Sequence, residues 1–548
     1  MKYILYLSTF FLFCIQTTGF SQNVAIPDTS FKKALIKFGV DTNSDKEISI
    51  SEAIAVDSLV VSKYDIKKLK GIEAFVNLTY FNCEENLLDT IDLTFNTKLK
   101  TLDISTNTIK FIDLTHNSKL EHVRAQNDYR LQKIDFTNCP ELISFDATSN
   151  DLRTLDLTHN AKLQSLEVSI RDVPSIDLSK NTELIKLSLI YAYLIPELDL
   201  SHNTKIENFS LSLTQTIKTI DFRPCTLLKG IFMTNNDKIE AINVSNLSQL
   251  NYIRLNYSPF FTGIDVSTCL NLTNLDINSN NISSLNIAKN KRLKSLACGR
   301  NNFTEINISA LDSLTRLECN NNKLVNLDIS KNKFLSTLIC NNNKLTALDF
   351  TNNLQMSNLY CSNNLIPKLS NLNTRNISSL SCSNNLLTEL VIASVSYFSS
   401  LDCSNNKLST LDLSKGNILY IYSFNSKGNP DLTCIQVSDT VLAKTKWSTG
   451  IDPQSQFKVN CGAVTGINDL TIPFSSTTVF PNPSIDGLFS ISNTEFSTFR
   501  LLSSVGHILA EGQIEGNILD FSTQEKGFYN LLLFNGVGGS VRKKILIK

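Results

Sequence analysis

The sequence lacks the features that mark several classes of protein. Its 548 residues carry 51 lysines and arginines against 51 aspartates and glutamates, so it has no basic excess of the kind that nucleic-acid-binding surfaces need. It has only five histidines, without metal-type spacing, and neither a glycine-rich phosphate loop nor a hydrolase nucleophile elbow. Beyond the N-terminus no run is long and apolar enough to span a membrane. These absences predict a non-catalytic protein that binds no nucleic acid, although an enzyme with an unmarked site remains an alternative.

The N-terminal segment 1–22 predicts a secretory signal peptide. An early lysine precedes an apolar core about a dozen residues long, which is too short for a stable membrane anchor. Small and polar residues follow, and we expect cleavage near Ser21 or Gln22. Cys14 leaves a lipoprotein signal open, although the bulky Phe13 precedes it. We therefore expect an exported chain without a membrane span.

A strict repeat occupies the middle of the chain. Six cysteines recur at one constant interval, at Cys298, Cys319, Cys340, Cys361, Cys382 and Cys403. Equivalent apolar positions continue back to Cys83 at the same interval or one position more, which predicts about 16 turns over residues 76–424. Each turn holds two apolar alternations, here called the A and B strands, as in Leu335-x-x-Leu338-x-Cys340 and Leu345-x-x-Leu348-x-Phe350. Stacked turns of two short parallel strands predict a mainly β solenoid.

An asparagine closes most A strands, as at Asn343, Asn364 and Asn385. An amide side chain turned inward can pair with backbone groups of adjacent turns. The complete motif, Leu-x-x-Leu-x-Cys-x-x-Asn-x-Leu, resembles that of bacterial leucine-rich-repeat proteins with 21-residue repeats. The resemblance implies a leucine-rich-repeat solenoid and a binding role, and it names no ligand.

Two kinds of cysteine are expected. The periodic ones lie in register, with side chains that run parallel into the core, so we predict buried free thiols rather than disulfides or a metal ladder. Cys434 and Cys461 lie beyond the last turn and flank Trp447, the only tryptophan. We expect a disulfide between them, within a C-terminal cap over residues 425–461.

Residues 23–75 predict a helical N-terminal cap, because Phe31, Ala34, Leu35 and Phe38 follow the spacing of one helix face. The loop that follows resembles the calcium loop of EF-hand and dockerin-type modules. The resemblance implies calcium, bound by the side chains of Asp41, Asn43, Asp45 and Glu52, by the Glu47 carbonyl and through water by Ser49. Lys46 stands where the family has glycine, so an acidic turn without metal remains the alternative.

The C-terminal end carries three short motifs after a polar linker over residues 462–478. They are Pro481, Asn482, Pro483 and Gly487, then Gly527, Phe528 and Tyr529, then the basic-apolar tail Lys543–Lys548. Residues 479–548 are thereby similar to the C-terminal sorting domain of the type IX secretion system of the Bacteroidetes. The resemblance implies a small β-sandwich that the type IX machinery uses to export the protein across the outer membrane. It further implies that the mature protein is secreted or attached to the cell surface.

The asparagine ladder lapses in the middle turns, from Val168 to Leu255. Outward A-strand positions there are expected to carry apolar, aromatic and arginine side chains, namely Ile170, Ile190, Tyr191, Phe232, Tyr252, Arg254 and Tyr257. Such side chains on a rigid sheet are typical of binding surfaces, and aromatic rings also suit sugars. We therefore predict that the concave sheet recognises a protein or a glycan. A surface adhesin or a structural surface-layer protein is the alternative.

Overall fold

The computed structural model describes residues 22–369, 377–392, 398–414, 420–461, 478–492, 496–503, 507–514, 516–535 and 540–548. Nearly all of the expected signal peptide and linker lies outside these ranges. The chain divides into two compact units, Met1–Cys461 and Gly462–Lys548. Within the described ranges, the helices are all too short or too polar to cross a membrane.

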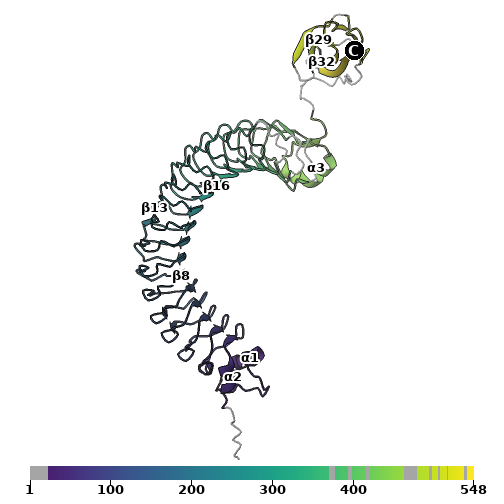
Figure 1. Ribbon diagram of the computed structural model, residues 1–548. Helices are drawn as coiled ribbons and strands as arrows, with labels where there is room; N and C mark the ends of the chain where they lie inside the picture. The colour runs from purple at the N-terminus through teal and green to yellow at the C-terminus, as the bar shows by residue number, and fades with distance from the viewer. Residues whose placement is uncertain are drawn as a thin grey trace, which may run out of the picture. The chain divides into compact units, whose positions relative to one another are not determined.

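The first unit is a curved solenoid whose inner face is one parallel sheet of 18 A strands (Figure 1). These strands are β1 (Ser58–Val60), β2 (Tyr80–Asn82), β3 (Thr101–Asp103), β5 (His122–Arg124), β7 (Ser144–Ala147), β8 (Ser165–Ser169), β9 (Lys186–Ile190), β10 (Asn208–Ser212), β12 (Gly230–Thr234), β14 (Tyr252–Asn256), β15 (Asn274–Asp276), β16 (Ser295–Ala297), β17 (Arg316–Glu318), β18 (Thr337–Ile339), β19 (Asn358–Tyr360), β20 (Ser379–Ser381), β22 (Ser400–Asp402) and β24 (Ser423–Asn425). The sheet starts at β1, one turn before β2 and ahead of the predicted boundary at residue 76, and its last strand β24 reaches residue 425. The stack is therefore longer than the sequence predicts.

Alternation along each A strand fills the core. The central leucines Leu317, Leu338 and Leu359 pair in register and are buried, as is the next inward residue of each turn. Cys319, Cys340 and Cys361 take that inward position as free buried thiols, as do the other periodic cysteines. The prediction of small apolar cysteines is thus confirmed, and each turn buries its apolar side only against its neighbours.

Asparagine amides tie the turns together. Asn343 donates through Nδ2 to the carbonyls of Cys319 and Cys340, both at 3.0 Å, and its Oδ1 accepts from the Leu324 N–H at 3.0 Å. A second ladder runs along the outer side, where Asn332 donates to two carbonyls in the same way. In that ladder Cys139 replaces an asparagine and donates through Sγ to the Leu114 carbonyl at 3.3 Å. These side chains satisfy backbone carbonyls that would otherwise be buried without partners.

On the outer side the B segments form regular strands in only some turns. They are β4 (Phe111–Asp113), β6 (Lys133–Asp135), β11 (Thr219–Asp221), β13 (Ala241–Asn243), β21 (Glu389–Val391) and β23 (Thr410–Asp412). Aspartates recur along this side, and each tightens its own turn. Asp113, for example, accepts from the Thr115 hydroxyl at 2.7 Å and from its N–H at 2.9 Å, and these bonds lower the pKa of Asp113. The stacked carboxylates are therefore stabilised by local hydrogen bonds.

Caps close both ends of the solenoid. The first holds α1 (Thr29–Phe38), α2 (Ile50–Ala55) and the 3-10 helix η1 (Ile72–Ala74), with Phe31, Ala34 and Leu35 buried. The second holds β25 (Cys434–Gln436), α3 (Thr440–Trp447), the 3-10 helix η3 (Ser448–Gly450) and β26 (Gln456–Lys458). Trp447 stacks on Phe424, with ring centroids 4.8 Å apart, and a disulfide joins Cys434 to Cys461 with 5.8 Å between their Cα atoms. The caps shield the apolar ends of the stack from water.

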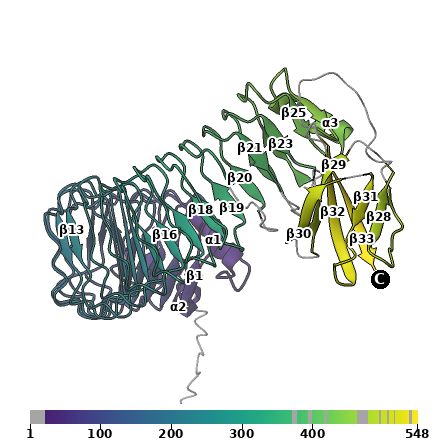
Figure 2. The ribbon, with the colours of Figure 1, turned by 90° about the horizontal axis from the view of Figure 1, so that it is seen from above.

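The second unit consists of two antiparallel sheets, and all of their strands except β27 are labelled in Figure 2. One contains β27 (Val479–Phe480), β28 (Leu488–Ile491) and β31 (Ile518–Asp520), and the other contains β29 (Phe496–Leu502), β30 (Ile508–Gln513), β32 (Gly527–Asn535) and β33 (Ser540–Ile547). Side chains including Phe489, Leu501, Leu531 and Ile545 form a separate core.

Two residues of the N-terminal motif of this unit have defined structural roles. The amide of Asn482 donates to the Lys544 carbonyl at 2.7 Å and accepts from the Leu546 N–H at 2.9 Å, so it holds the last strand. Gly487 has φ +78°, and a Cβ atom there would lie 2.7 Å from backbone atoms of Ser522. Pro481 and Pro483 flank Asn482 and follow cis peptide bonds.

Candidate functional site

The inner sheet of the solenoid widens in its middle turns. Strands β8, β9, β10, β12 and β14 each have five residues, whereas β15 to β20 each have three. Thr214 and Ser258, both buried, stand there in place of ladder asparagines. The register places Ser210, Phe232 and Arg254 side by side on the exposed face, and Asn208, Gly230 and Tyr252 form the adjacent row.

Phe232, Tyr252 and Arg254 form a cluster on this face, here called the aromatic platform. The Phe232 and Tyr252 rings stack with centroids 4.7 Å apart and planes 22° apart, and Phe232 is 40% exposed. The Arg254 guanidinium lies over the Tyr252 ring at 5.8 Å and pairs with Asp276 at 3.2 Å. Asp276 also accepts from Asn256 at 3.0 Å, so the arginine is held beside the rings. Stacked aromatic rings with a fixed arginine are a frequent hot-spot arrangement.

Gly230 makes room for the platform. A Cβ atom at this position would lie 3.1 Å from Cε2 of the Phe232 ring. The absence of a side chain therefore lets Phe232 lean over strand β12 towards Tyr252.

Large side chains also occupy strained corners beside the widened strands. Tyr191, Leu213 and Tyr257 have φ values of 57°, 59° and 55°, at the corner where later turns place Asn321, Asn342 and Asn363. Left-handed backbone costs about 1 kcal/mol or more for a bulky residue, whereas asparagine tolerates it. Tyr257 is 54% exposed, and the Arg171 guanidinium lies over Tyr191 at 5.6 Å. Such strain is a common companion of functional surfaces.

The structure separates the predicted binding residues into three groups. Phe232, Tyr252 and Arg254 touch, and Tyr257 lies at the corner that follows β14. Ile190 and Tyr191 lie two strands away, at the end of β9. The prediction for Ile170 is wrong, because this side chain is fully buried. Ile170 follows the inward Val168 by two residues, so alternation turns both towards the core.

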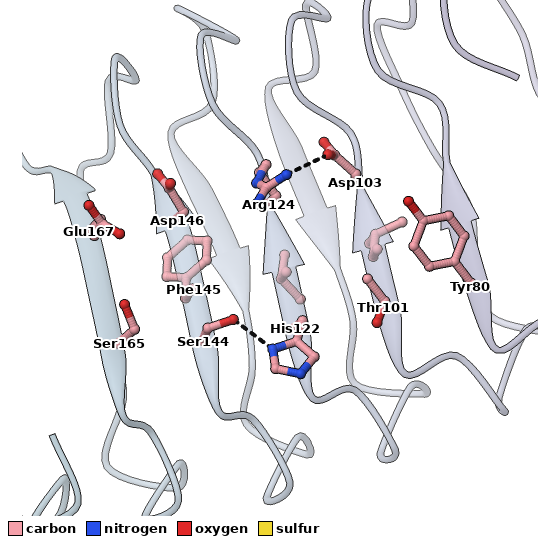
Figure 3. A pocket seen from close by; sticks show the side chains of 12 residues that line it. Tyr80, Thr101, Asp103, His122, Arg124, Ser144, Phe145, Asp146, Ser165 and Glu167 are labelled. Atoms are coloured by element: carbon pink, nitrogen blue, oxygen red, sulfur yellow. Dashed lines mark hydrogen bonds and ion pairs between the residues drawn. The ribbon is translucent and has the colours of Figure 1, made fainter. Parts of the chain in front are cut away.

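A second feature of the inner face is a hollow of about 490 Å³ across β2 to β8 (Figure 3). Four charged side chains line it as a row, in the order Asp103, Arg124, Asp146 and Glu167. Arg124 pairs with Asp103 at 3.5 Å, and Glu167 pairs with Lys186 on β9 at 2.6 Å. Thr101, His122, Ser144 and Ser165 form the polar row beside it.

His122 and Ser144 share a hydrogen bond of 2.8 Å between Nδ1 and Oγ. A histidine beside a serine is also how hydrolases activate a nucleophile, which usually requires a third group that orients the histidine. In the part of the chain that the structure describes, Ser144 is the one side chain within hydrogen-bond distance of the His122 ring. The hydrogen bond joins the neighbouring strands β5 and β7.

Sequence reasoning missed this hollow. Its charged residues come from four successive A strands, one repeat apart, and each taken alone resembles an ordinary outward residue. The available signal was that Asp103, Arg124, Asp146 and Glu167 hold the same position in successive repeats.

The acidic loop of the N-terminal cap is held by its own hydrogen bonds. Glu52 accepts from the Ser49 N–H at 2.9 Å and from the Thr42 N–H and hydroxyl at 2.8 and 2.7 Å, and these bonds lower the pKa of Glu52 to about 2. Asp41 accepts from the Lys46 N–H at 3.0 Å through Oδ2. Lys46 adopts φ +66°, the left-handed conformation that glycine has in the resembled loop.

Calcium binding by this loop would depend on its side-chain oxygens. Asp41 Oδ1 is buried without a hydrogen-bond partner, and Asn43 and Asp45 use an oxygen each to close turns. The Glu47 side chain pairs with Lys32, and its predicted ligand is the backbone carbonyl. Among the described residues no three His, Cys, Asp or Glu side chains converge on one point. Calcium binding by Asp41, Asn43, Asp45, Glu47 and Glu52 stays a prediction, which a calcium titration would test.

Comparison with known proteins identifies the fold. No protein-family model matches this sequence, and no curated protein matches it. The functional domain of InlJ from Listeria monocytogenes, described as including a cysteine ladder, matches with a TM-score of 0.57 and 17% identity over 96% of this chain and 100% of that chain. The plant peptide hormone receptor RGFR1 in complex with RGF2 matches with a TM-score of 0.54 and 18% identity over 68% and 67%. The fold is thus a leucine-rich-repeat solenoid, which this chain shares with InlJ and with a plant peptide hormone receptor.

Proposed function

We propose that this protein is an exported recognition protein without catalytic activity, which binds a protein ligand along the inner sheet of its solenoid. The single observation that carries the proposal is the aromatic platform. Phe232 and Tyr252 expose stacked rings on a rigid sheet, beside an arginine fixed by Asp276. Aromatic side chains are rigid and lose little conformational entropy on binding, and aromatic and arginine side chains together supply most of the energy of many interfaces.

A protein ligand is favoured over a glycan by two considerations. RGFR1, which has the same fold, is in complex with the peptide RGF2, so such a solenoid can present its surface to a polypeptide. The inner face of this chain also combines an apolar platform with charged and hydroxyl side chains over many strands, which suits the mixed chemistry of a polypeptide. A glycan remains the second ligand class that the experiment below separates.

The proposal that the protein is exported depends on the two ends of the chain. We propose that residues 1–22 direct export and that residues 479–548 are a type IX sorting domain, with secretion or surface attachment as the result. The hydrogen bonds of Asn482 to the last strand support a structural reason for the Pro-Asn-Pro motif. Fusion of residues 462–548 to a reporter in a bacterium with a type IX system should direct the reporter outside the cell. An Asn482→Ala fusion that is exported equally well would count against this role for the motif.

The binding proposal is tested by comparing two triple variants of the full-length protein. Phe232→Ala, Tyr252→Ala and Tyr257→Ala together remove the exposed rings at the platform. Phe95→Ala, Phe111→Ala and Phe334→Ala remove exposed rings that lie outside the inner sheet. Each protein is immobilised and exposed to the proteins of the culture medium, and each is also applied to a glycan array. We expect the wild type and the second triple variant to retain a protein that the first triple variant does not retain. Equal retention by all three would refute the proposal.

A further inference from the structure

One carboxylate in the hollow forms no ion pair, although Arg124 is its register neighbour on β5. Asp103 is paired with Arg124 and Glu167 with Lys186, whereas Asp146 forms no ion pair with any lysine or arginine of the described chain. Its oxygens accept hydrogen bonds from neutral groups, the Gln126 amide, the Thr148 hydroxyl at 3.1 Å and the Thr148 N–H at 3.2 Å. The hollow therefore keeps one uncompensated negative charge near its centre.

The position of Asp146 places its charge next to a second carboxylate. Asp146 and Glu167 are direct partners in the parallel register of β7 and β8, so their backbones lie about 4.8 Å apart. Like charges directly opposite each other on neighbouring strands repel. Figure 3 shows both carboxylates on the same exposed side of the sheet, above the row of hydroxyl side chains. A cation brought between them from outside would relieve this repulsion.

We propose that the hollow receives a lysine or arginine side chain of the protein ligand, which pairs with Asp146 and Glu167. This inference rests on the proposed function and specifies the chemistry of the ligand. The hollow, at about 490 Å³, is large enough for one long basic side chain. Ser144 and Ser165, the neighbours of the two acids in the adjacent row, offer acceptors for the remaining N–H groups.

The hollow and the aromatic platform are close enough for one segment of polypeptide. The strands run in the order β7, β8, β9, β10 and β12, so four steps of about 4.8 Å separate Asp146 from Phe232, roughly 19 Å. An extended chain advances about 3.3 Å per residue, so this distance corresponds to roughly six residues. The ligand is therefore expected to present a basic residue and an aromatic or large apolar residue about six positions apart.

The test uses labelled twelve-residue peptides and the full-length protein in fluorescence anisotropy. Each peptide of one pool carries one basic residue, lysine or arginine, and one aromatic residue, tryptophan or tyrosine. Four to eight serines or alanines separate the two, and both orders are included. The matched pool carries glutamine in place of the basic residue. The proteins are the wild type, Asp146→Asn, the platform variant Phe232→Ala with Tyr252→Ala, and the control Asp177→Asn, which removes an exposed aspartate that closes a turn of the outer side. Thermal melts verify that all variants are folded.

We expect the wild type to bind the basic pool more tightly than the glutamine pool. Asp146→Asn should lower the affinity for the basic pool by about tenfold and leave the affinity for the glutamine pool unchanged. Asp177→Asn should bind as the wild type does, and added salt should reduce the preference for the basic pool. Unchanged binding of the basic pool by Asp146→Asn overturns the inference. If the platform variant nevertheless binds the peptides more weakly, the proposed function is supported without this inference. If neither variant loses affinity, or no pool binds saturably, both the proposed function and this inference are refuted.

Discussion

Asp128 occupies a ladder position next to Asn107 and accepts a hydrogen bond from the Asn107 backbone N–H through Oδ1. Its other oxygen, Oδ2, is buried without a hydrogen-bond partner, and the residue is only 1% exposed. In the adjacent turn, Asn107 uses the equivalent side-chain nitrogen to donate to the carbonyls of Cys83 and Ile104. In the same register, the Asp128 side chain faces the carbonyls of Ile104 and Ala125. An ionised carboxylate has no hydrogen to donate to them. Burial, with the charge of Asp103, raises the pKa of Asp128 to about 7.

Replacement of Asp128 by asparagine should therefore stabilise the solenoid, and more at high pH. The folded-state pKa lies above the ordinary value of 3.8, so between these values the folded protein binds more protons than the unfolded one. The free energy of unfolding of the wild type should then fall as pH rises from about 4 to about 7. We expect Asp128→Asn to be more stable by about 2 kcal/mol at pH 8, and by less at pH 5, in denaturant unfolding. An equal difference at both pH values would contradict this account.

Glu52 should show the opposite dependence on pH. Its pKa of about 2 is below the ordinary value of 4.5, so its contribution is complete above about pH 4.5 and is lost as pH falls towards 2. Glu52→Gln should destabilise the N-terminal cap by about 2 kcal/mol at pH 7 and have little effect at pH 2, because the side chain both caps α2 and holds Thr42. Hydrogen exchange of the α2 amides measures this. Glu47→Gln, which loses only the partly exposed pair with Lys32, serves as the control and should cost less than about 1 kcal/mol.

Gly230→Ala should weaken ligand binding without unfolding the protein. The new methyl group would meet the Phe232 ring at 3.1 Å, so the ring would have to shift, which disturbs its stack on Tyr252. We expect affinity for the captured ligand to fall about fivefold, since an aromatic pair contributes roughly 1 kcal/mol. Gly263→Ala is the matched control, because a Cβ atom there meets nothing within 4 Å. Equal affinities of the two variants would argue against a role for the stacked rings.

The buried free cysteines of the solenoid should resist alkylation until the protein unfolds. Ten free cysteines are buried, and burial raises the pKa of Cys319 and Cys361 to about 12, so their reactive thiolates are scarce. Iodoacetamide at pH 8 should leave these ten unmodified in the native protein and label all of them in guanidinium chloride, as read by mass spectrometry. Rapid labelling of Cys340 in the native protein would contradict the packing of the ladder.

Much of the fold could be predicted from the sequence, because equivalent positions recur in every turn of the repeat. The inward Cys340, the ladder Asn343 and the outward Phe232 follow from the nearly constant period of the repeat combined with alternation. Single occurrences are less informative. The first A strand, Ser58–Val60, lies one repeat before Cys83, the earliest position assigned to the repeat, so the sheet begins earlier than expected. Ile170 is wrongly expected on the exposed face when it is compared with the outward positions of other turns rather than with Val168.

The candidate site was predictable only in part, since its properties depend on neighbours in space. Aromatic residues in the middle turns were visible, but the contact between Phe232 and Tyr252 depends on Gly230, whose importance appears only in three dimensions. That Asp146 forms no ion pair likewise depends on the pairing of Arg124 with Asp103 and of Lys186 with Glu167 across neighbouring strands. Pairing across strands, rather than residue type, distinguishes these positions.

Site-specific photo-crosslinking tests the central claim, recognition along the inner sheet, most directly. Ser210 pairs in register with Phe232 on the inner sheet, whereas Thr115 lies in a turn of the outer side. With p-benzoylphenylalanine in place of each in turn, irradiation with the captured ligand should give a covalent adduct from position 210 and none from position 115. An adduct from position 115 with none from position 210 would contradict the account.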